Sequence, residues 1–230
     1  MTISVIIPAL NEEISIGSLV SYLLKRGEQE VLEVIVVDGG SQDNTVSAAT
    51  QAGAKVISSS ITSRAAQMNA GAAVAKGDLL YFVHADTKPP KSFVTDLSEA
   101  LQEGYSSGCY RYVFDSPSRM LRINAWFTRF DRLMFRGGDQ TLFIQKNVFE
   151  SLGGFDERFV IMEEYDFLMR LRQQHSFKII QKDMVVSARK YETNSWLRVQ
   201  IANLVAMVMF RTNVSPLRIK ETYKRLLNYR

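Results

Sequence analysis

Carboxylates follow two apolar segments in the first half of the chain. Asp38 ends the apolar run 33–38, and Asp86 follows the run 79–83. Short apolar runs bounded by glycine and proline are typical of buried strands. Ligands bind at the carboxyl edge of an open parallel sheet, where a carboxylate can hold a hard divalent cation against a phosphate. Asp86 therefore has two interpretations, a metal ligand or a cap for the turn before Pro89.

Three more carboxylates open a later helical segment. Glu163, Glu164 and Asp166 come just before apolar residues that are spaced to pack on one side, such as Phe167 and Leu171. The helix dipole stabilises acidic residues at a helix N-terminus, which is a sufficient structural reason for them. The functional alternative is a general base placed where its helix enters an active site.

Strand and helix patterns alternate through the first half of the chain. The patterns predict strands at 3–7, 33–38, 55–58 and 79–83, and helices at 14–26, 44–52 and 63–75. Short links between such strands are typical of a parallel sheet covered on both faces, an α/β fold. The chain has neither a G-x-G-x-x-G after the first strand nor a P-loop motif, so we expect neither a dinucleotide-binding fold nor a P-loop fold.

The second half predicts further elements in a less regular order. They are a helix at 91–104, strands at 109–114 and 141–145, helices at 146–153 and 162–171, edge strands at 178–180 and 184–186, and a helix pair after 195. The tail beyond Pro216 is basic. We expect the helix pair to fold back on the domain or to pair with a second subunit as a homodimer, with docking on an anionic membrane as a third alternative.

Composition restricts the class of protein. The chain has 230 residues, which is enough for one large domain or a domain with a small appendage. Its net charge is +4. The charge is too small to indicate nucleic acid. A single cysteine, Cys109, excludes an internal disulfide and fits the cytoplasm. We expect no signal peptide, because residues 2–8 have the pattern of a strand without a basic n-region. We expect no membrane-spanning helix, because no apolar run reaches about 18 residues.

Arginines recur near helical spacing in the segment 118–136, which we predict to be one helix. Six arginines and two aspartates lie between Arg111 and Arg136. The apolar residues share the opposite side: Ile123, Trp126, Phe127, Phe130, Leu133 and Met134. Three interpretations stay open: an amphipathic helix packed on the sheet, an anion-facing wall near the active site, or a surface helix on an acidic membrane. The last would place the protein peripherally on the inner membrane face.

Several motifs stand in one order along the chain. They are Val5-Ile6-Ile7-Pro8-Ala9-Leu10-Asn11-Glu12, Val36-Val37-Asp38-Gly39-Gly40-Ser41, Arg64-Ala65-Ala66-Gln67-Met68-Asn69, His84-Ala85-Asp86, Gly153-Gly154-Phe155-Asp156 and Glu163-Glu164-Tyr165-Asp166. In this order they resemble the family 2 glycosyltransferases, over roughly residues 3–172. The resemblance implies the GT-A fold, a Rossmann-like, mixed and mostly parallel sheet covered by helices. We place this catalytic domain at 1–190 and a C-terminal helical extension at 191–230.

The ending of the chain is similar to one bacterial subgroup of that family. The relevant residues are Gly138-Asp139-Gln140, Ser187-Ala188-Arg189 and Trp196-Leu197-Arg198. Members of the subgroup are often found beside radical-enzyme genes.

The resemblance implies roles for individual residues. Those that would bind the nucleotide-sugar donor are Pro8, Ala9, Asn11, Glu12, Asp38, Gly39, Arg64, Asn69 and Ala85. Within this set, Glu12 would hold ribose, Asp38 the base edge, and Arg64 with Asn69 would face the diphosphate. Asp86, with His84 as a second contact, would bind a divalent metal, Mn²⁺ or Mg²⁺. Glu164 matches the general base, and Asp166 an acidic position that supports its helix.

Three positions depart from the family pattern. Gly39 replaces an aspartate that commonly follows the base-binding one, and His84 replaces the first aspartate of the D-x-D motif. Imidazole suits Mg²⁺ less well than carboxylate does. Glu164 is one methylene longer than the usual aspartate base.

The implied activity is an inverting, metal-assisted transfer of a hexosyl group. The sugar would move from a UDP- or GDP-sugar to an acceptor hydroxyl of a glycan, lipid or small molecule. Two alternatives stay open: a sugar-phosphate nucleotidyltransferase, and a membrane-associated protein that binds nucleotide sugars with weak or no catalysis.

Overall fold

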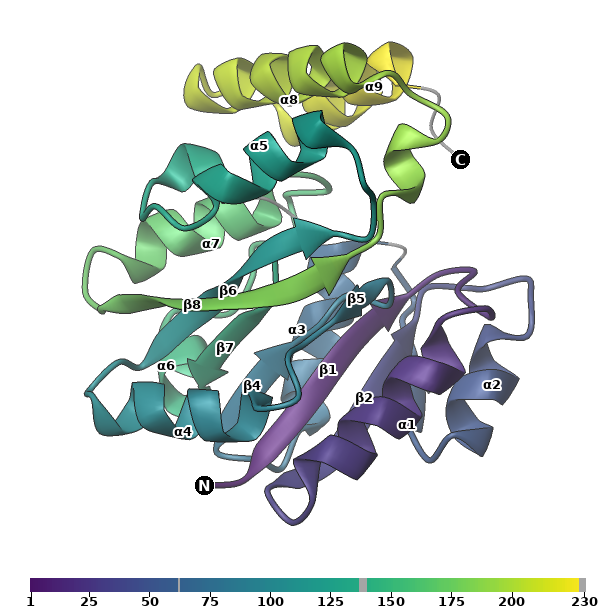
Figure 1. The fold of residues 1–230 in the computed structure, drawn as a ribbon, viewed down its shortest axis with the longest axis vertical. Coiled ribbons are helices and arrows are strands. Elements are labelled where there is room, and N and C mark those ends of the chain that lie inside the picture. Colours follow the sequence, from purple (N-terminus) through teal and green to yellow (C-terminus); the bar gives the residue numbers. More distant parts are fainter. Residues whose placement is uncertain (62, 137–139, 228–230) are drawn as a thin grey trace.

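Eight strands form one mixed sheet in the described part of the computed structural model, which covers residues 1–61, 63–136 and 140–227 (Figure 1). Their order across the sheet is β3-β2-β1-β4-β7-β6-β8-β5. The strands are β1 (Ile3–Ala9), β2 (Val31–Asp38), β3 (Lys55–Ser58), β4 (Leu79–Phe82), β5 (Thr87–Lys88), β6 (Ser107–Phe114), β7 (Leu142–Gln145) and β8 (Phe177–Val186).

The first four strands run parallel to one another. β1 lies between β2 and β4, and β3 pairs with β2. β7 then inserts antiparallel between β4 and β6, while β8 runs parallel to β6. This is the mixed, mostly parallel sheet expected of the GT-A fold, so the predicted fold class is confirmed.

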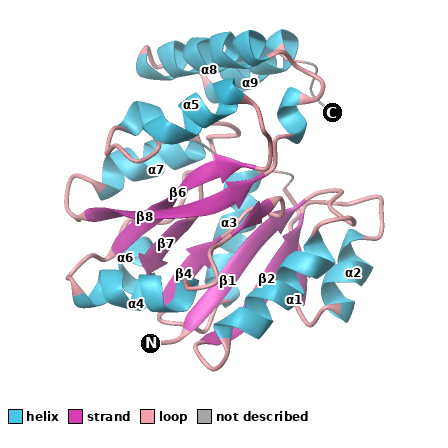
Figure 2. Cartoon of the chain, viewed as in Figure 1, coloured by secondary structure: helices cyan, strands magenta, loops and turns pink. Residues whose placement is uncertain are grey.

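Helices cover both faces of the sheet (Figure 2). One face packs against α1 (Ile16–Gly27), α2 (Thr45–Gln51) and α4 (Phe93–Gln102). The other packs against α3 (Arg64–Val74), α6 (Lys146–Ser151) and α7 (Glu163–Leu171). Buried residues of β1 alternate between the two cores, Val5 and Ile7 in one and Ile6 in the other. This alternation is what a strand buried on both faces requires.

Two further helices form a small core of their own beyond the sheet. They are α8 (Trp196–Arg211) and α9 (Pro216–Leu226), and they lie at the top of Figure 1. Val199, Ala202 and Ala206 of α8 are buried with Ile219 and Tyr223 of α9. The predicted helix pair is therefore present. The division of the chain near residue 190 stays a prediction.

The arginine-rich segment differs from the single helix that we expected. It forms α5 (Arg119–Phe127) and a short 3₁₀ turn, η1 (Leu133–Phe135). Arg136 turns inward, is buried, and donates hydrogen bonds to the backbone carbonyls of Thr128 and Phe130. Those bonds close the loop that follows α5. α5 does pack on the sheet, against β6, with Leu121 and Ala125 buried, but the apolar side that we expected to pack is largely exposed.

The two expected edge strands form one continuous strand, β8. Its pairing with β6 shifts register at Arg111, which lies opposite Asp183, whereas Tyr110 lies opposite Ile180. The bulge accommodates polar residues that interrupt the apolar pattern, which is why the pattern predicted a break.

Of the expected motif residues 138–140, positions 138 and 139 lie outside the described residues.

Gly71 lets α3 approach the sheet. A Cβ at this position would lie 2.5 Å from Cγ2 of Ile6. We expect Gly71→Ala to lower the free energy of unfolding by about 1–3 kcal/mol, because the helix must move away from β1. Denaturant unfolding followed by circular dichroism measures the change.

Gly17→Ala is the matched control. Gly17 lies in α1, and its Cβ would meet only ordinary contacts, at 3.4 Å and beyond. Alanine there should be neutral or should stabilise by up to about 1 kcal/mol through helix propensity. Equal effects of the two substitutions would contradict the proposed close approach.

Candidate active site

The carboxyl ends of β1, β2 and β4 meet at one edge of the sheet. In the parallel pairing of β1 with β2, Pro8 lies opposite Val37 and Ala9 opposite Asp38. β4 runs parallel on the other side of β1, so the segment that follows it, with Asp86, reaches the same edge. The two strand-end carboxylates predicted from the sequence are thus brought to one side of the molecule.

Hydrogen bonds join the loop after β1 to the loop after β2. Asn11 has a left-handed backbone, φ 55°, and its N–H donates to the Ser41 hydroxyl at 2.9 Å. Its side-chain oxygen accepts from the Gln42 N–H at 2.8 Å. The Glu12 N–H donates to the Thr45 hydroxyl at 2.7 Å. These contacts hold Asn11 and Glu12 at the sheet edge beside the β2 loop.

Asp38 is buried and held by its own turn. Its carboxylate accepts backbone hydrogen bonds from Gly40 at 3.0 Å and from Ser41 at 3.2 Å. A carboxylate offers about four acceptor sites, so these bonds orient the group and leave capacity for a ligand. Its predicted contact with the base edge stays a prediction.

The side chain of Gln67, on α3, lies close to Gly39, the residue that follows Asp38. The buried Gln67 amide donates to the carbonyls of Ala9 at 3.0 Å and Val37 at 2.8 Å, joining the ends of two strands. A Cβ at Gly39 would lie 2.9 Å from its Nε2. A side chain here would therefore require the Gln67 amide to shift from these two hydrogen bonds. The signal in the sequence was a polar residue on the side of a helix that faces the sheet.

Arg189 pairs with two carboxylates that the sequence assigned to the donor and the metal. Its guanidinium donates to the Glu12 carboxylate, at 2.9 Å for Nη1 to Oε2, and its Nη2 lies 3.3 Å from Oδ2 of Asp86. β5 creates this proximity, since Thr87 pairs with Val186 and the Ser187 N–H donates to the Asp86 carbonyl. The sequence marked Arg189 as part of a motif but did not predict this role.

His84 lies against the acidic start of α7. Its Nε2 is 3.2 Å from the Gln140 carbonyl oxygen and 3.4 Å from Oε1 of Glu164. Because both neighbours are acceptors, Nε2 carries the proton. A protonated nitrogen has no lone pair for a metal, so only Nδ1 remains for the predicted ligation. The structure brings His84 to the predicted base.

Glu163 is almost fully buried beside this pair. Nη1 of Arg64 lies 3.8 Å from its Oε1. Burial raises the pKa of Glu163 above its ordinary value, the adjacent Glu164 raises it further, and Arg64 opposes both effects. Arg64, which we predicted to face the diphosphate, is thus also a partner of the acidic helix start.

Asp166 and Asn69 both support the turn that precedes α7. Asp166 accepts from Arg170 at 2.9 Å, and Arg170 also donates to the Gly154 carbonyl. The Asn69 amide accepts from the Phe155 N–H at 3.0 Å and donates to the Phe155 carbonyl at 2.8 Å. These bonds use both ends of the amide and hold Asn69 to this turn; its predicted place facing the diphosphate stays a prediction. The Ala85 side chain is in the core, which leaves only its backbone for a donor.

One carboxylate, Asp86, is the candidate metal ligand at this edge. Within the described ranges, no three His, Cys, Asp or Glu side chains cluster as a metal cage. Mg²⁺ typically needs no such cage, since it binds through one or two carboxylates, substrate phosphates and water. The residues therefore fit a metal that arrives with a diphosphate.

A sequence profile of glycosyl transferase family 2 matches residues 4–155. The undecaprenyl-phosphate 4-deoxy-4-formamido-L-arabinose transferase of Aeromonas hydrophila is 28% identical over 182 residues, which are 75% of this chain and 49% of that protein. The glucosyl-3-phosphoglycerate synthase of Mycolicibacterium smegmatis is 38% identical over 97 residues, 39% of this chain and 32% of that one. The chain thus spans half or less of the length of these two relatives.

Solved structures share the fold. Glucosyl-3-phosphoglycerate synthase from Mycobacterium tuberculosis, crystallised with Mg²⁺ and UDP, has a TM-score of 0.61 and 22% identity, covering 89% of this chain and 78% of that one. Staphylococcus aureus TarS, residues 1–349, has a TM-score of 0.66 and 16% identity, covering 97% and 69%. At these identities the likeness concerns the fold alone.

The raised pKa of Glu163 predicts a pH-dependent stability. The folded chain keeps this proton to higher pH than the unfolded chain does, so stability falls as pH rises above the ordinary glutamate range. Glu163→Gln mimics the protonated form. We expect it to stabilise the protein more at about pH 8 than at about pH 5, measured by urea unfolding. Glu221→Gln, at an exposed position on α9, is the control and should show no such difference.

Proposed function

Because the chain belongs to glycosyl transferase family 2, we propose that it transfers a sugar from a nucleoside diphosphate sugar to an acceptor hydroxyl. The observation that carries the proposal is the pairing of Glu164 with His84 at the sheet edge that also holds Asp86 and Arg189. A base, cationic groups and a metal-binding carboxylate are the groups that such a transfer needs.

The donor would lie across the loops after β1 and β2. Asp38 and Glu12 would accept hydrogen bonds from the base and the ribose. Pro8, Ala9, Asn11 and Gly39 would line the pocket, with Arg64 toward the diphosphate. The Mycobacterium tuberculosis neighbour was crystallised with UDP and Mg²⁺, which supports a UDP-sugar as the first donor to test.

Asp86 would hold Mn²⁺ or Mg²⁺ together with the diphosphate oxygens. When bound, the metal supplies positive charge against the departing nucleoside diphosphate. Arg189 stands beside the same carboxylate and would add positive charge where the leaving group becomes negative. The bound metal and Arg189 would then both stabilise the negative charge of the leaving group.

Glu164 would act as the general base. Its carboxylate would accept the proton of the acceptor hydroxyl as the oxygen attacks the anomeric carbon opposite the leaving group, which inverts that centre. The His84 N–H would hold Glu164 in orientation, as a third group does for a base in other active sites. Asp166 would act only through Arg170, by fixing the helix on which Glu164 stands.

The names of two relatives indicate which classes of acceptor to propose for this chain. One relative is named for undecaprenyl phosphate and another for 3-phosphoglycerate, a lipid and a small molecule that both carry phosphate. We therefore propose an acceptor that carries an anionic group and offers a hydroxyl, as 3-phosphoglycerate does; undecaprenyl phosphate has no hydroxyl apart from its phosphate and supports the anionic group alone. The subgroup beside radical-enzyme genes and the homodimer stay predictions.

A second candidate is a protein that binds nucleotide sugars with little turnover. Gly39 and His84 depart from the family pattern, and Arg189 occupies the neighbourhood of Asp86. Binding of UDP-sugars without transfer or hydrolysis would favour this candidate. Release of pyrophosphate from a nucleoside triphosphate would instead indicate a nucleotidyltransferase.

Removing the base tests the mechanism. We expect Glu164→Gln to lower kcat by about 10²–10⁴-fold with little change in donor affinity. Transfer and hydrolysis would be measured with a panel of UDP- and GDP-sugars and Mn²⁺, and donor binding by calorimetry. Glu99→Gln, at an exposed position on α4, is the control. Unchanged turnover in Glu164→Gln would refute the assignment.

Arg189 should compete with a metal for Asp86. Replacing it by glutamine removes a cation beside this carboxylate, so we expect Mn²⁺ to bind about three- to tenfold more tightly in the absence of donor. Calorimetric titration with Mn²⁺ measures the change. Lys190→Gln is the matched control, because Lys190 lies over the Tyr223 ring. Equal or weaker Mn²⁺ binding in Arg189→Gln would show that the guanidinium does not oppose the metal.

A further inference from the structure

The outer side of α8 carries an exposed apolar stripe. Leu197, Ile201, Leu204 and Val208 follow one another at intervals of four, three and four residues, and each is 46–64% exposed. The opposite side of the same helix is buried against α9. No helix of the described residues is both long and apolar enough to cross a membrane.

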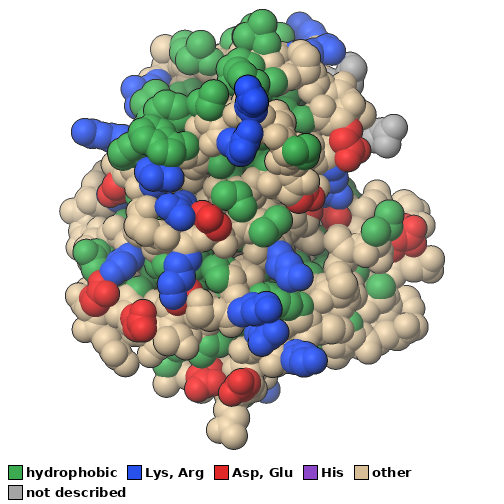
Figure 3. Space-filling model, in the orientation of Figure 1, with side chains coloured by type: hydrophobic (Ala, Val, Ile, Leu, Met, Phe, Trp, Pro, Cys, Tyr) green, Lys and Arg blue, Asp and Glu red, His purple; other side chains and the backbone are tan. Residues whose placement is uncertain are grey.

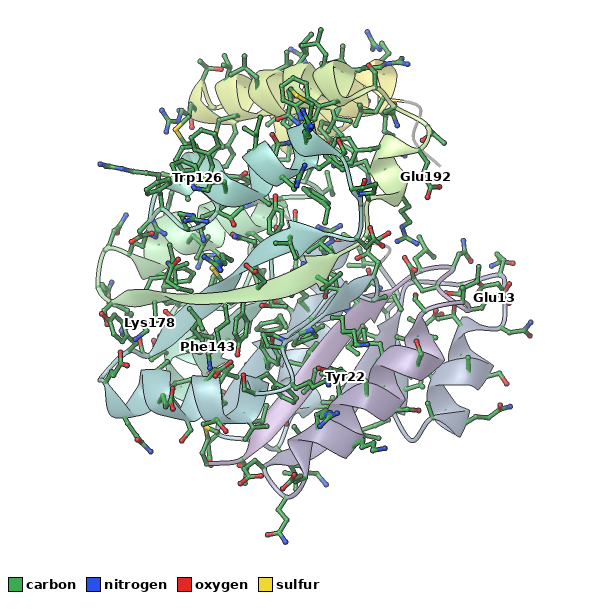
Figure 4. All side chains as sticks on the ribbon, viewed as in Figure 1. Glu13, Tyr22, Trp126, Phe143, Lys178 and Glu192 are labelled. Atoms are coloured by element: carbon green, nitrogen blue, oxygen red, sulfur yellow. The ribbon has the colours of Figure 1, made fainter. Side chains whose placement is uncertain are left out.

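α5 extends this apolar surface. Its exposed large residues, with those of the loop and turn that follow, are Met120, Ile123, Trp126, Phe127, Phe130 and Met134. The Trp126 and Phe130 rings lie 4.8 Å apart, and Trp126 lies at the outer edge of the molecule (Figure 4). The Trp196 indole N–H donates to the Asn124 side chain at 3.3 Å, which ties α8 to α5. Figure 3 shows hydrophobic side chains gathered at this end of the molecule.

We call this surface the α5–α8 face. It is rich in positive charge, since the segments 118–134 and 195–212 contain six arginines and one acidic residue, Asp131, which pairs with Arg172. The six are Arg119, Arg122, Arg129, Arg132, Arg198 and Arg211. An apolar stripe with aromatic residues and an arginine fringe has the chemistry of a helix that lies in a membrane interface.

The charge argues against a second copy as the occupant. In a symmetric dimer the same patch meets itself, so six arginines of one copy would face six of the other. An anionic bilayer surface offers the opposite sign, and juxtamembrane cations each gain about 1 kcal/mol near it. Apolar side chains then add burial at about 25 cal/mol per Å².

We propose that the α5–α8 face docks peripherally on an anionic lipid bilayer. The apolar stripe of α8 and the aromatic cluster of α5 enter the headgroup region, and the arginines contact lipid phosphates. This inference does not rest on the proposed transfer reaction, because the face and the donor edge use different residues.

Vesicle flotation of the full chain tests the proposal. We expect weak binding to phosphatidylcholine vesicles and at least about tenfold stronger binding when about 30 mol % phosphatidylglycerol is present. The difference should shrink with added salt. Equal binding to both vesicles, or no binding to either, would overturn the proposal.

Two double variants separate the apolar and the charged contributions. Leu197→Glu with Leu204→Glu should lower binding to the anionic vesicles about tenfold or more, because two exposed apolar groups of the stripe are replaced by anions. Arg122→Gln with Arg211→Gln, both at exposed positions, should lower anionic binding and leave binding to neutral vesicles unchanged. Circular dichroism would verify that each variant is folded.

Leu32→Glu is the control for the apolar substitutions. Leu32 is 51% exposed and lies near the start of β2, a strand in the lower part of Figure 1, whereas α8 lies at the top. It should leave vesicle binding unchanged. Light scattering tests whether a second copy covers the face instead. If the chain is a dimer that the Leu197 and Leu204 substitutions dissociate, and if it does not bind vesicles, the face is a protein interface and the lipid assignment is refuted.

Discussion

The gathering of carboxylates at one edge of the sheet is the constraint on which the site depends. Each acidic group there is found with a positive or hydrogen-bond-donating partner. Glu12 and Asp86 share Arg189, Glu163 has Arg64, Glu164 has His84, and Asp38 has the amides of Gly40 and Ser41. Neighbouring carboxylates disfavour one another's ionised form, so their cationic and hydrogen-bond-donating partners stabilise the folded arrangement. An anionic donor would need the same cations, so binding would redistribute these pairs.

Those partners come from segments far apart in the chain, and the sheet brings them together. Arg189 follows β8, and it reaches Asp86 because β5 pairs antiparallel with the end of β8. Gln67 comes from α3 and joins the ends of β1 and β2. Both depend on strand register, since a shift of one residue would turn the side chains to the other face of the sheet.

Local patterns predicted much of the fold and part of the site. Apolar runs located the strands that end at Asp38 and precede Asp86, and the acidic start of a helix located Glu164. The contacts of Arg189, Asn69 and Gln67 could not be predicted, because each joins segments whose register is visible only in the folded chain. Periodicity also tells which residues share one side of a helix but not which side meets the protein. For α5 the apolar side faces outward.

The helix pair at the end of the chain is linked physically to the predicted base. Met162, immediately before Glu163, has a left-handed backbone with φ 67°, which is strained for a side chain of this kind. Met162 packs with Ile161 against the small core of α8 and α9, and the Tyr165 ring lies 6.1 Å from that of Phe210. Such packing can hold a strained residue, and here it sets where α7 begins. The orientation of Glu164 therefore depends on helices that contribute no predicted catalytic residue, because their contacts determine how its own helix enters the site.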